Sequence, residues 1–330
     1  MTDLTDLADL PGEWTATAEA LLPSSTPAAQ PAWTAEAVVA VVDGAPVGVL
    51  ALHRSRTGVV GDVLDPAAVA PGLFGGVGVA DVLYLGGVAD LVAGTATAAH
   101  LSPADRAAVR RALVAAGVEQ ARLRGARPVA LYVRDAEVDD FTAAGLGRER
   151  VAGTSTLAVA GTDEEFLAGL SANARRTVRK DRARAAEVGL RVRTEPAAAL
   201  LADPAACAQA VELVMAVKRA HGVVDHPRLV RSRLAAWAAR PAGERVAHLV
   251  DAGGPPLAVT FACAVERRVE VYETGMAGEG PVHEAYLESL VHAPLRQALA
   301  GGLVEVDLGL EAETPKTRRG AVVAPVWAVG

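Results

Sequence analysis

The sequence predicts an α/β (α+β) protein of two tandem lobes, each with a mixed central sheet flanked by helices. Two observations support this fold class. The 330 residues exceed one ordinary domain and suit two domains of roughly 150 to 170 residues each. One order of elements, namely hairpin, strand, long helix, strand and last strand, also occurs twice along the chain. We therefore expect a first lobe at 1–160 and a second lobe at 161–330.

The first copy of this order begins with a hairpin at 36–52, whose turn Asp43-Gly44 joins two valine-rich runs. Ser102 is expected to cap a long helix that Gly125 ends. The other expected elements are strands at 81–85, 128–133 and 154–159 and a short helix around 139–144. Residues 1–33 are expected to wrap over this lobe, and 72–81 to form a flexible connection.

The second half opens with two expected helices, at 163–169 and 172–188. Thr162 and Glu165 have the spacing of a capping box, and Ser171 is the expected cap of the second helix. Pro294 should kink the long helix of this copy. The remaining expected elements are helices at 204–221, 227–239 and 283–300 and strands at 191–194, 245–250, 257–265, 269–274, 304–308 and 321–328.

Composition excludes several classes of protein. The chain has no uninterrupted apolar run of about 18 residues, so no membrane span is expected. Its acidic start does not resemble a signal peptide, and Cys207 and Cys263 lie in apolar stretches, which suits reduced thiols in the cytoplasm. No metal site is expected, because the run from His221 to His226 fits a loop between helices better than ligand spacing. A monomer is expected.

The element order resembles the GNAT acyltransferase fold present twice, as in FemAB-like transferases, which include aminoacyl-tRNA-dependent peptidyltransferases. That family has a strand of the type hydrophobic-Asp-x-Gly, followed by a Lys and a Gly. The resemblance covers the second lobe, and the first only as a fold pattern. It implies an N-acyltransferase that forms an amide on a small peptide or metabolite amine. The matching stretches are 170–189, 272–280, 283–302, 304–320 and 324–327, with Asp307, Gly309, Lys316 and Gly320 in the motif.

One departure from the GNAT pattern bears on the donor. Acetyl-CoA-dependent members usually carry an Arg/Gln-x-x-Gly-x-Gly/Ala loop before the long helix, where backbone N–H groups hold pyrophosphate. This loop pattern is absent from the stretch before the helix of Ser102, which reads LVAGTATAAH, and from the stretch before His283, which reads MAGEGPV. Gly278 and Gly280 could form a small nest, although Glu279 between them disfavours an anion. We therefore expect no tightly bound cofactor and an aminoacyl-tRNA donor. An acyl-CoA donor and a non-catalytic ligand-binding protein are the alternatives.

A basic stretch on this acidic chain, of net charge −7, indicates an anionic partner. On a helix, Arg175, Arg179 and Arg182 share one face, with Arg176 and Lys180 beside them. A tRNA acceptor end is an array of phosphates that guanidinium groups bind well. A solvated helix face is the alternative, since the chain has only three lysines and uses arginine in most basic positions. The predicted donor-binding residues are Arg175, Arg176, Arg179, Lys180, Arg318 and Arg319.

Three residues are candidates for catalysis. The resemblance implies that Lys316, in an expected loop between two strands, stabilises the oxyanion of acyl transfer; a basic surface turn is the alternative. Glu273 is a candidate general base, provided that its surroundings raise its pKa, and Glu270 on the other strand face is equally placed. Asp307 is expected to orient Lys316 or Arg319, or to cap a turn. Tyr272 and Tyr286 are expected to line the same pocket, unless they pack in the core.

Overall fold

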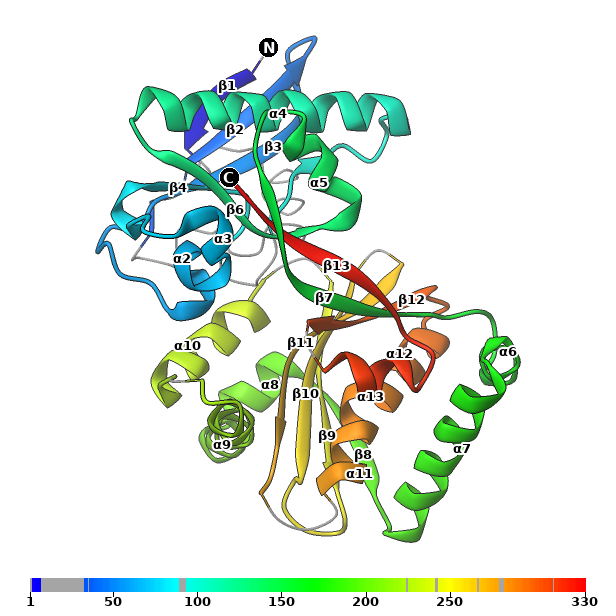
Figure 1. Cartoon of the computed structure of the whole chain (residues 1–330). Helices are drawn as coiled ribbons and strands as arrows, with labels where there is room; N and C mark the ends of the chain where they lie inside the picture. The colour runs from blue at the N-terminus through cyan, green and yellow to red at the C-terminus, as the bar shows by residue number, and fades with distance from the viewer. Residues whose placement is uncertain are drawn as a thin grey trace. The chain divides into compact units, whose positions relative to one another are not determined.

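The computed structural model describes residues 2–6, 33–34, 36–88, 93–223, 225–240, 243–265, 267–278, 282–310 and 312–330 (Figure 1). The chain divides into two compact units. Unit 1 comprises Met1–Ala152 and Ala324–Gly330, and unit 2 comprises Gly153–Val323. Each unit has a mixed sheet with helices against it, so the predicted fold class is confirmed.

Unit 1 has the strand order β1-β2-β3-β4-β6-β13, with β5 beside β3. Among the strands that the structure describes in this unit, only β4 and β6 run parallel, and the long helix α4 lies in the connection between them. The strands are β1 (Thr2–Asp6), β2 (Glu36–Val42), β3 (Ala45–His53), β4 (Val82–Leu85), β5 (Ala96–Thr97), β6 (Arg127–Arg134) and β13 (Val322–Val329). The helices are η4 (Asp62–Leu64), α2 (Pro66–Val69), α3 (Pro71–Phe74), η5 (Val79–Asp81), α4 (Pro103–Leu123) and α5 (Asp135–Thr142).

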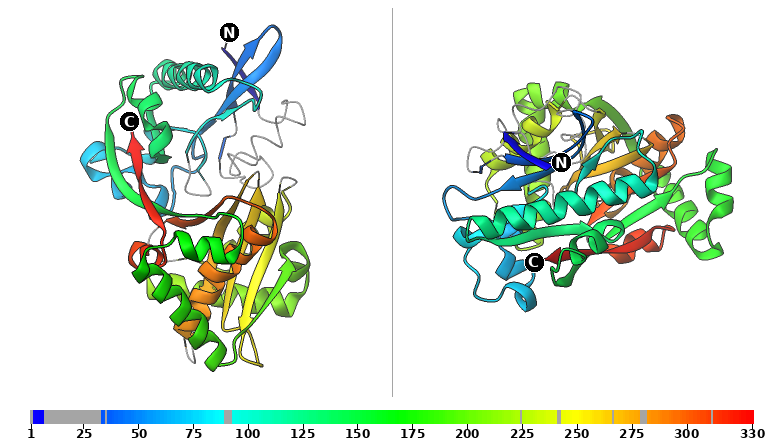
Figure 2. Two further views of the ribbon diagram at one scale, coloured as in Figure 1. Left: turned by 90° about the vertical axis from the view of Figure 1, so that its right-hand side faces the viewer. Right: turned by 90° about the horizontal axis from the view of Figure 1, so that it is seen from above.

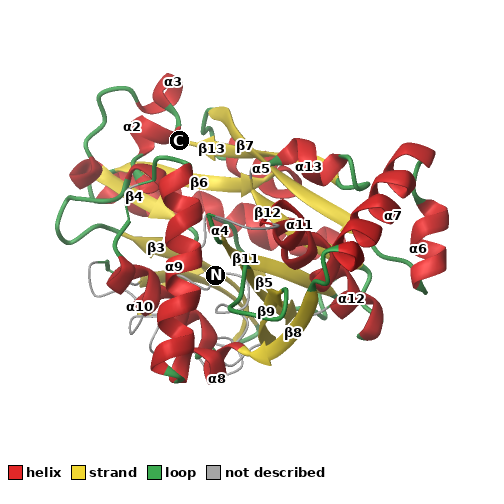
Figure 3. Cartoon of the chain, turned by 90° about the horizontal axis from the view of Figure 1, so that it is seen from below, coloured by secondary structure: helices red, strands yellow, loops and turns green. Residues whose placement is uncertain are grey.

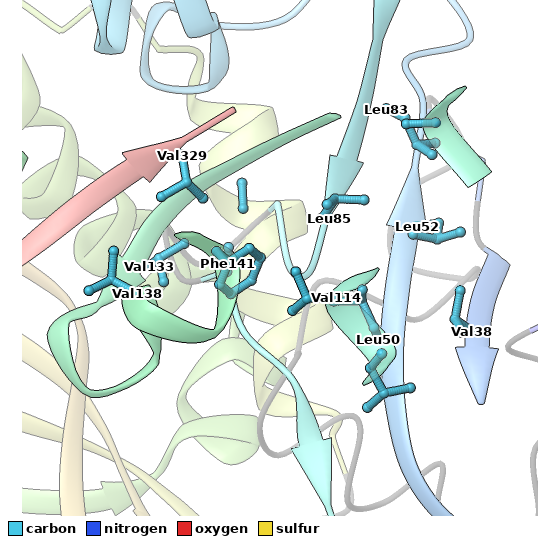
Figure 4. Packing of buried hydrophobic residues seen from close by; sticks show 14 of the residues in the cluster. Val38, Leu50, Leu52, Leu83, Leu85, Val114, Val133, Val138, Phe141 and Val329 are labelled. Carbon is cyan, nitrogen blue, oxygen red and sulfur yellow. The ribbon is translucent and has the colours of Figure 1, made fainter. Parts of the chain in front are cut away.

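The predicted hairpin and the predicted helix cap are both confirmed in unit 1. Asp43 and Gly44 have φ angles of 51° and 80°, as a tight turn between β2 and β3 requires. The Ser102 hydroxyl accepts a hydrogen bond from the Asp105 N–H at the start of α4. Helix α4 lies across the sheet (Figure 2) and shares its core, part of which Figure 4 shows. Gly117 permits this contact, since a Cβ there would lie 2.8 Å from Leu50 Cδ2.

Unit 2 has the strand order β7-β12-β11-β10-β9-β8, in which only β11 and β12 run parallel. The strands are β7 (Arg148–Ala158), β8 (Arg191–Pro196), β9 (Glu244–Asp251), β10 (Ala258–Val265), β11 (Arg268–Met276) and β12 (Glu305–Leu310). The helices are α6 (Asp163–Gly169), α7 (Ala172–Glu187), α8 (Ala197–Ala202), α9 (Pro204–Ala220), α10 (Pro227–Ala238), α11 (Val282–Leu287), η6 (Glu288–His292), α12 (Ala293–Ala300) and α13 (Glu313–Thr317).

Two cores lie on opposite faces of the unit 2 sheet. On one face, Val214 of α9 and Trp237 of α10 pack with Phe261 of β10. On the other face, Leu290 and Leu295 of the η6 and α12 segment pack with β11 and β12. Figure 1 shows α8, α9 and α10 on one side of β9–β11 and α11 and α12 on the other. The sheet therefore separates the side chains of the α9 and α10 core from those of the η6 and α12 core.

The predicted boundary near 160 differs from the division in the structure. The second half of β7 pairs with β12, with Ala158 opposite Glu305, and so belongs to unit 2. Most of β13 pairs with β6, with Val326 opposite Arg134, and so belongs to unit 1. The final strand of each predicted lobe thus lies in the other unit. Strand propensity is local, whereas the partner of a strand depends on long-range pairing.

The long helix of unit 2 is interrupted where the sequence contains Pro294. Instead of one helix at 283–300, the structure has α11, the π-helical segment η6 and then α12, with Pro294 in the first turn of α12. Proline has no N–H and its ring clashes with the carbonyl four residues earlier, so a widened turn just before it accommodates both defects. The π-helical turn buries His292, which is 1% exposed.

Other differences concern segments expected to lack regular structure. The loop expected around Lys316 contains the helix α13, and 72–81 contains the end of α3 and η5. Within 1–33, β1 pairs with β2, while residues 7–32 lie outside the described residues, as do Glu279 and Gly280 of the expected glycine nest. Among the described residues, no helix is both long and apolar enough to cross a membrane.

Two buried histidines make stability depend on pH. Burial lowers the pKa of His53 to about 4, partly offset by its hydrogen bond to the Thr34 carbonyl, and burial also lowers the pKa of His248 to about 4. Both are protonated more readily in the unfolded chain, whose histidines titrate near 6.5. We therefore expect the free energy of unfolding to be highest above pH 6.5 and to fall as pH drops toward 4. The fall is at most about 1.4 kcal/mol per pH unit for each histidine.

Urea unfolding at several pH values measures this slope. His53→Asn keeps an N–H donor and removes the titrating ring, so the slope should be smaller in this variant than in the unmodified protein. Equal slopes in the two proteins would contradict the assignment to His53.

Candidate functional site

A pocket of about 400 Å³ in unit 2 brings together several predicted donor-binding residues. Its walls come from α7, the start of α11 and α13, and Figure 3 shows α7 beside α11. The volume lies in the range usual for pockets that bind small organic ligands, roughly 300–1,000 Å³. We call it the basic pocket, and its lining residues are Arg176, Thr177, Lys180, Asp181, Arg184, His283, Thr314, Pro315, Arg318 and Arg319.

Helix α7 presents one row of basic residues to this pocket. The Ser171 hydroxyl caps the helix, as predicted, and Val178 is buried beneath it. The row Arg176, Lys180 and Arg184, spaced by four residues, lines the pocket. The sequence instead favoured the neighbouring row of Arg175, Arg179 and Arg182.

The members of that neighbouring row have other surroundings. The Arg175 guanidinium donates to the Leu167 carbonyl, at 3.4 Å. Arg182 forms two hydrogen bonds of 2.7 Å to Asp163, which lower the pKa of that carboxyl. Arg179 is exposed and is not part of the pocket lining. Amphipathic spacing alone does not distinguish a row that binds neighbouring helices from one that lines a pocket.

Three cations of the basic pocket have no counter-charge among the described residues. Arg176, Lys180 and Arg318 are exposed, and across the described ranges none of their side chains has an ion-pair or hydrogen-bond partner. A fourth, Arg184, lies 4.0 Å from Glu284. Like charges converging on a small volume repel one another unless an anion binds between them. The pocket is therefore suited to an anionic ligand.

Two lining residues of the basic pocket, Arg319 and Asp181, form an ion pair. Arg319 is 5% exposed, and its Nε and Nη2 donate to the two Asp181 carboxylate oxygens at 2.7 and 3.0 Å. His292 Nε2 lies 3.5 Å from Asp181 Oδ2. Burial acts to raise the pKa of Asp181, but His292 and Arg319 outweigh it and hold that pKa below its usual range. The Arg319 guanidinium thus binds Asp181 in this structure, although it was predicted to grip phosphate.

Lys316 and Asp307 together fix the turn between β12 and α13. Lys316 is 2% exposed, and its ammonium donates to the carbonyls of Gly309 and Leu310 at 3.0 and 2.9 Å. The Asp307 carboxylate accepts from the Gly309 N–H at 2.9 Å and from the Thr154 hydroxyl at 3.1 Å. Gly309 has a φ of 73°, which favours glycine. We call this group the β12–α13 clamp; neither Lys316 nor Asp307 lines the basic pocket, but both fix the start of a helix that does.

A β-bulge in β11 changes the expected orientation of Tyr272 and Glu273. Strand alternation predicts opposite faces for these neighbours, but Phe261 pairs with Glu273 and Ala262 with Val271, so Tyr272 is the extra residue. Tyr272 stacks on Trp237 of α10 with ring centroids 4.7 Å apart, and Glu273 also reaches α10. Tyr286 packs in the core on the opposite face. The structure therefore does not bring Tyr272, Glu273, Tyr286 and Lys316 into one pocket.

Glu273 belongs to a cluster of four alternating charges. Its carboxylate lies 3.6 Å from Lys218 Nζ and 3.3 Å from Arg233 Nη2, and Asp225 lies 3.5 and 3.2 Å from the same two groups. Asp225 is in the loop between α9 and α10, as predicted, and His226 caps α10 by accepting from the Arg228 N–H. Burial acts to raise the pKa of Asp225, but the His226 N–H and Arg233 outweigh it and lower that pKa. The geometry favours an ion-pair role for Glu273.

Glu273→Gln distinguishes this role from general-base catalysis. Loss of one carboxylate leaves two cations facing Asp225 alone, so the free energy of unfolding should fall by about 1–3 kcal/mol. The rate of acyl transfer should stay close to that of the unmodified protein. A general base would instead give a rate loss of about 10²–10⁴ with stability retained. Urea unfolding and single-turnover transfer, measured on the same sample, separate the two outcomes.

Comparisons with known proteins agree with the fold. A family model described as an acetyltransferase (GNAT) domain matches residues 172–317. The structure of FemX is similar with a TM-score of 0.60 and 11% identity, over 96% of this chain and 90% of that one. No curated protein sequence matches the chain.

Two further structures are similar in fold. A tandem GNAT protein from the clavulanic acid biosynthesis pathway has a TM-score of 0.52 and 15% identity, over 100% of this chain and 98% of that one. The C-terminal domain of a protein described as a lysylphosphatidylglycerol synthetase from Agrobacterium fabrum has a TM-score of 0.56 and 11% identity, over 86% and 80% of the two chains. Residues 172–317 of unit 2 thus match a GNAT acetyltransferase domain, and the chain has the fold of FemX and of the tandem GNAT protein.

Proposed function

We propose that this acyltransferase takes an aminoacyl group from aminoacyl-tRNA and transfers it to an amine of a small peptide or metabolite. The observation that supports this most directly is the basic pocket, where Arg176, Lys180 and Arg318 face the ligand space without counter-charges among the described residues. Arginine binds phosphate oxygens through paired N–H groups, and lysine binds them as a point charge. The acceptor end of a tRNA offers several phosphates at short spacing. The fold likeness to FemX is consistent with such a donor.

The reaction is an aminolysis of an ester. The amine nitrogen attacks the aminoacyl carbonyl, the ester C–O bond breaks, and an amide C–N bond forms. The proton released by the amine goes to the departing ribose oxygen, so no outside reagent is consumed. In this proposal Arg176, Lys180 and Arg318 bind and orient the donor, and the β12–α13 clamp positions α13, which Arg318 directly follows. Correct placement of the two reactants is itself a large part of the rate gain.

An acyl-CoA donor is the second candidate. The specific observation in its favour is the fold likeness to a tandem GNAT protein over 100% of this chain, in a structure whose description names AcCoA as absent. Coenzyme A also carries phosphates, so the same three cations would suit it. The transferred group would then leave a thiol instead of a ribose hydroxyl.

Product stability to alkali tests the proposal. The purified protein is incubated with tRNA charged with a mixture of labelled amino acids and with a panel of peptides and small amines. Aminoacyl esters hydrolyse in alkali to the free amino acid whereas amides survive, so label that stays joined to the peptide or amine after alkali, separated from free amino acid, reports transfer. We expect such label from aminoacyl-tRNA and none from acetyl-CoA. Amide formation from acetyl-CoA alone would establish the second candidate in place of the first.

A further inference from the structure

A second pocket in unit 2 lies between the sheet and α12. Its volume is about 240 Å³, somewhat below the usual range of roughly 300–1,000 Å³ for pockets that bind drug-sized ligands. It shares no lining residue with the basic pocket. We call it the β8–α12 pocket, and its lining residues are Val192, Thr194, Glu244, Val246, His248, Ala293, Arg296 and Gln297.

A chain of hydrogen bonds with a fixed direction forms one wall of this pocket. His248 is 1% exposed, and burial, partly offset by its hydrogen bond to Gln297, keeps the ring neutral by lowering its pKa to about 4. Its Nε2 lies 3.0 Å from Gln297 Oε1, which can only accept, so Nε2 carries the ring proton. Nδ1 then accepts from the Thr194 hydroxyl at 3.0 Å.

The direction of these hydrogen bonds determines which donors and acceptors in this wall remain for a ligand. With Oε1 of Gln297 occupied by His248, the amide NH₂ is the part of that side chain left to donate. With its proton on His248, the Thr194 hydroxyl keeps lone pairs that can accept. Because His248 is neutral above its lowered pKa, this arrangement holds throughout the physiological pH range.

The charged residues of the pocket come from two different elements. Arg296 of α12, next to Gln297, has Nη2 2.6 Å from Oε1 of the buried Glu288, which fixes the guanidinium. Glu244 of β9 is exposed, and within the part of the chain that the structure describes its carboxylate has no ion-pair or hydrogen-bond partner. The hydrogen-bond donors Arg296 and Gln297 therefore lie on α12, and the acceptor Glu244 lies on β9. The apolar side chains Val192, Val246 and Ala293 complete the lining.

From this arrangement we propose that the β8–α12 pocket binds a free α-amino acid in its zwitterionic form. The ligand carboxylate is bound by Arg296 and the Gln297 amide, and its ammonium group by Glu244. A small aliphatic side chain then contacts Val192, Val246 and Ala293. Both charges of the ligand meet an opposite charge, and the pocket is too small for a ligand much larger than one residue. This binding does not depend on which donor occupies the basic pocket.

Titration of the isotope-labelled protein with L-valine, followed by NMR, tests the proposal. We expect saturable shifts of the Gln297 side-chain NH₂ signal, and at least tenfold weaker binding of N-acetyl-L-valine and of L-valinamide, each of which lacks one charge. Arg296→Gln and Glu244→Gln should each weaken L-valine binding at least tenfold. Arg193→Gln, which changes an exposed arginine of β8 paired with Glu195, is the matched control and should leave it unchanged.

Three results would overturn the proposal. One is an unshifted Gln297 NH₂ signal at tens of millimolar L-valine. Another is equal binding of L-valine and N-acetyl-L-valine, which would identify a simple anion site. The last is equal weakening by Arg193→Gln and Arg296→Gln. Because the Gln297 signal is read in the unmodified protein, a variant that fails to fold does not remove the test.

Discussion

Replacing Arg176, Lys180 and Arg318 together by glutamine is expected to weaken donor binding roughly 10²–10³-fold, at about 1 to 1.5 kcal/mol for each lost charged contact. All three side chains face the basic pocket and have no partner among the described residues, so no internal interaction is lost with them. The free energy of unfolding should therefore stay the same or rise slightly, because mutual repulsion is removed. Equilibrium binding of aminoacyl-tRNA and urea unfolding measure both effects.

The salt dependence of binding gives a second readout of the same substitution. Each phosphate contact to a single strand contributes about −0.7 to the slope of log affinity against log salt, so the slope should become shallower by about 2 in the triple variant. Arg191→Gln is the matched control, because Arg191 is an exposed arginine on β8 of the same unit and lies outside the pocket lining. If the control weakened binding as much as the triple variant, general surface charge would explain the affinity.

Lys316→Met is expected to have the other large effect, on stability and donor binding at once. Methionine fills much of the same volume but leaves the half-buried carbonyls of Gly309 and Leu310 without their donor. At about 1–3 kcal/mol for each of the two unsatisfied groups, the free energy of unfolding should fall by about 2–6 kcal/mol. Disorder at the start of α13 should then weaken donor binding through Arg318. A lysine that stabilises the oxyanion directly would instead reduce the single-turnover rate about 10²–10³-fold, with stability and donor affinity retained.

Asp307 offers a milder test of the β12–α13 clamp. Asp307→Asn keeps Oδ1, which accepts from both Gly309 and Thr154, whereas Asp307→Ala removes it. We expect the asparagine variant to retain most of the donor affinity and the alanine variant to lose it together with stability. Equal and complete loss of transfer in both, with donor affinity unchanged, would show that the negative charge itself takes part in the chemistry.

Much of the fold follows from local signals in the sequence. The Asp43-Gly44 turn, the Ser102 and Ser171 caps and the capping box of Thr162 and Glu165 all act within a few residues, and each is found where it was predicted. The duplicated order of elements likewise gave the fold class. The exchange of β7 and β13 between the units was not predictable in this way, because strand pairing depends on residues far apart in the chain.

The site was predicted less completely, for three physical reasons. The density of basic residues identified α7 as a candidate. Which row of its side chains lines a pocket depends on the neighbouring elements, and Arg182 of the favoured row binds Asp163. Alternation of side chains along a strand predicts opposite faces for Tyr272 and Glu273, but a β-bulge turns both side chains toward α10. Lys316 was predicted to reach the pocket from a loop, with a basic surface turn as the alternative, yet two carbonyls bind its ammonium in the interior. The β8–α12 pocket has no sequence signal, since its walls come from three separate elements.

The most direct test of the proposed donor site uses the lysine content of the chain. Of its three lysines, Lys180 is exposed in the basic pocket, Lys218 is held by Asp225 and Glu273, and Lys316 is 2% exposed. Brief treatment with an amine-acylating reagent, followed by mass spectrometry, therefore reports on Lys180 with Lys218 as an internal reference. Bound aminoacyl-tRNA is predicted to slow the modification of Lys180 at least about tenfold and to leave that of Lys218 unchanged, since a phosphate contact removes the ammonium from solvent. An unchanged rate at Lys180 under saturating aminoacyl-tRNA would contradict the basic pocket as the donor site.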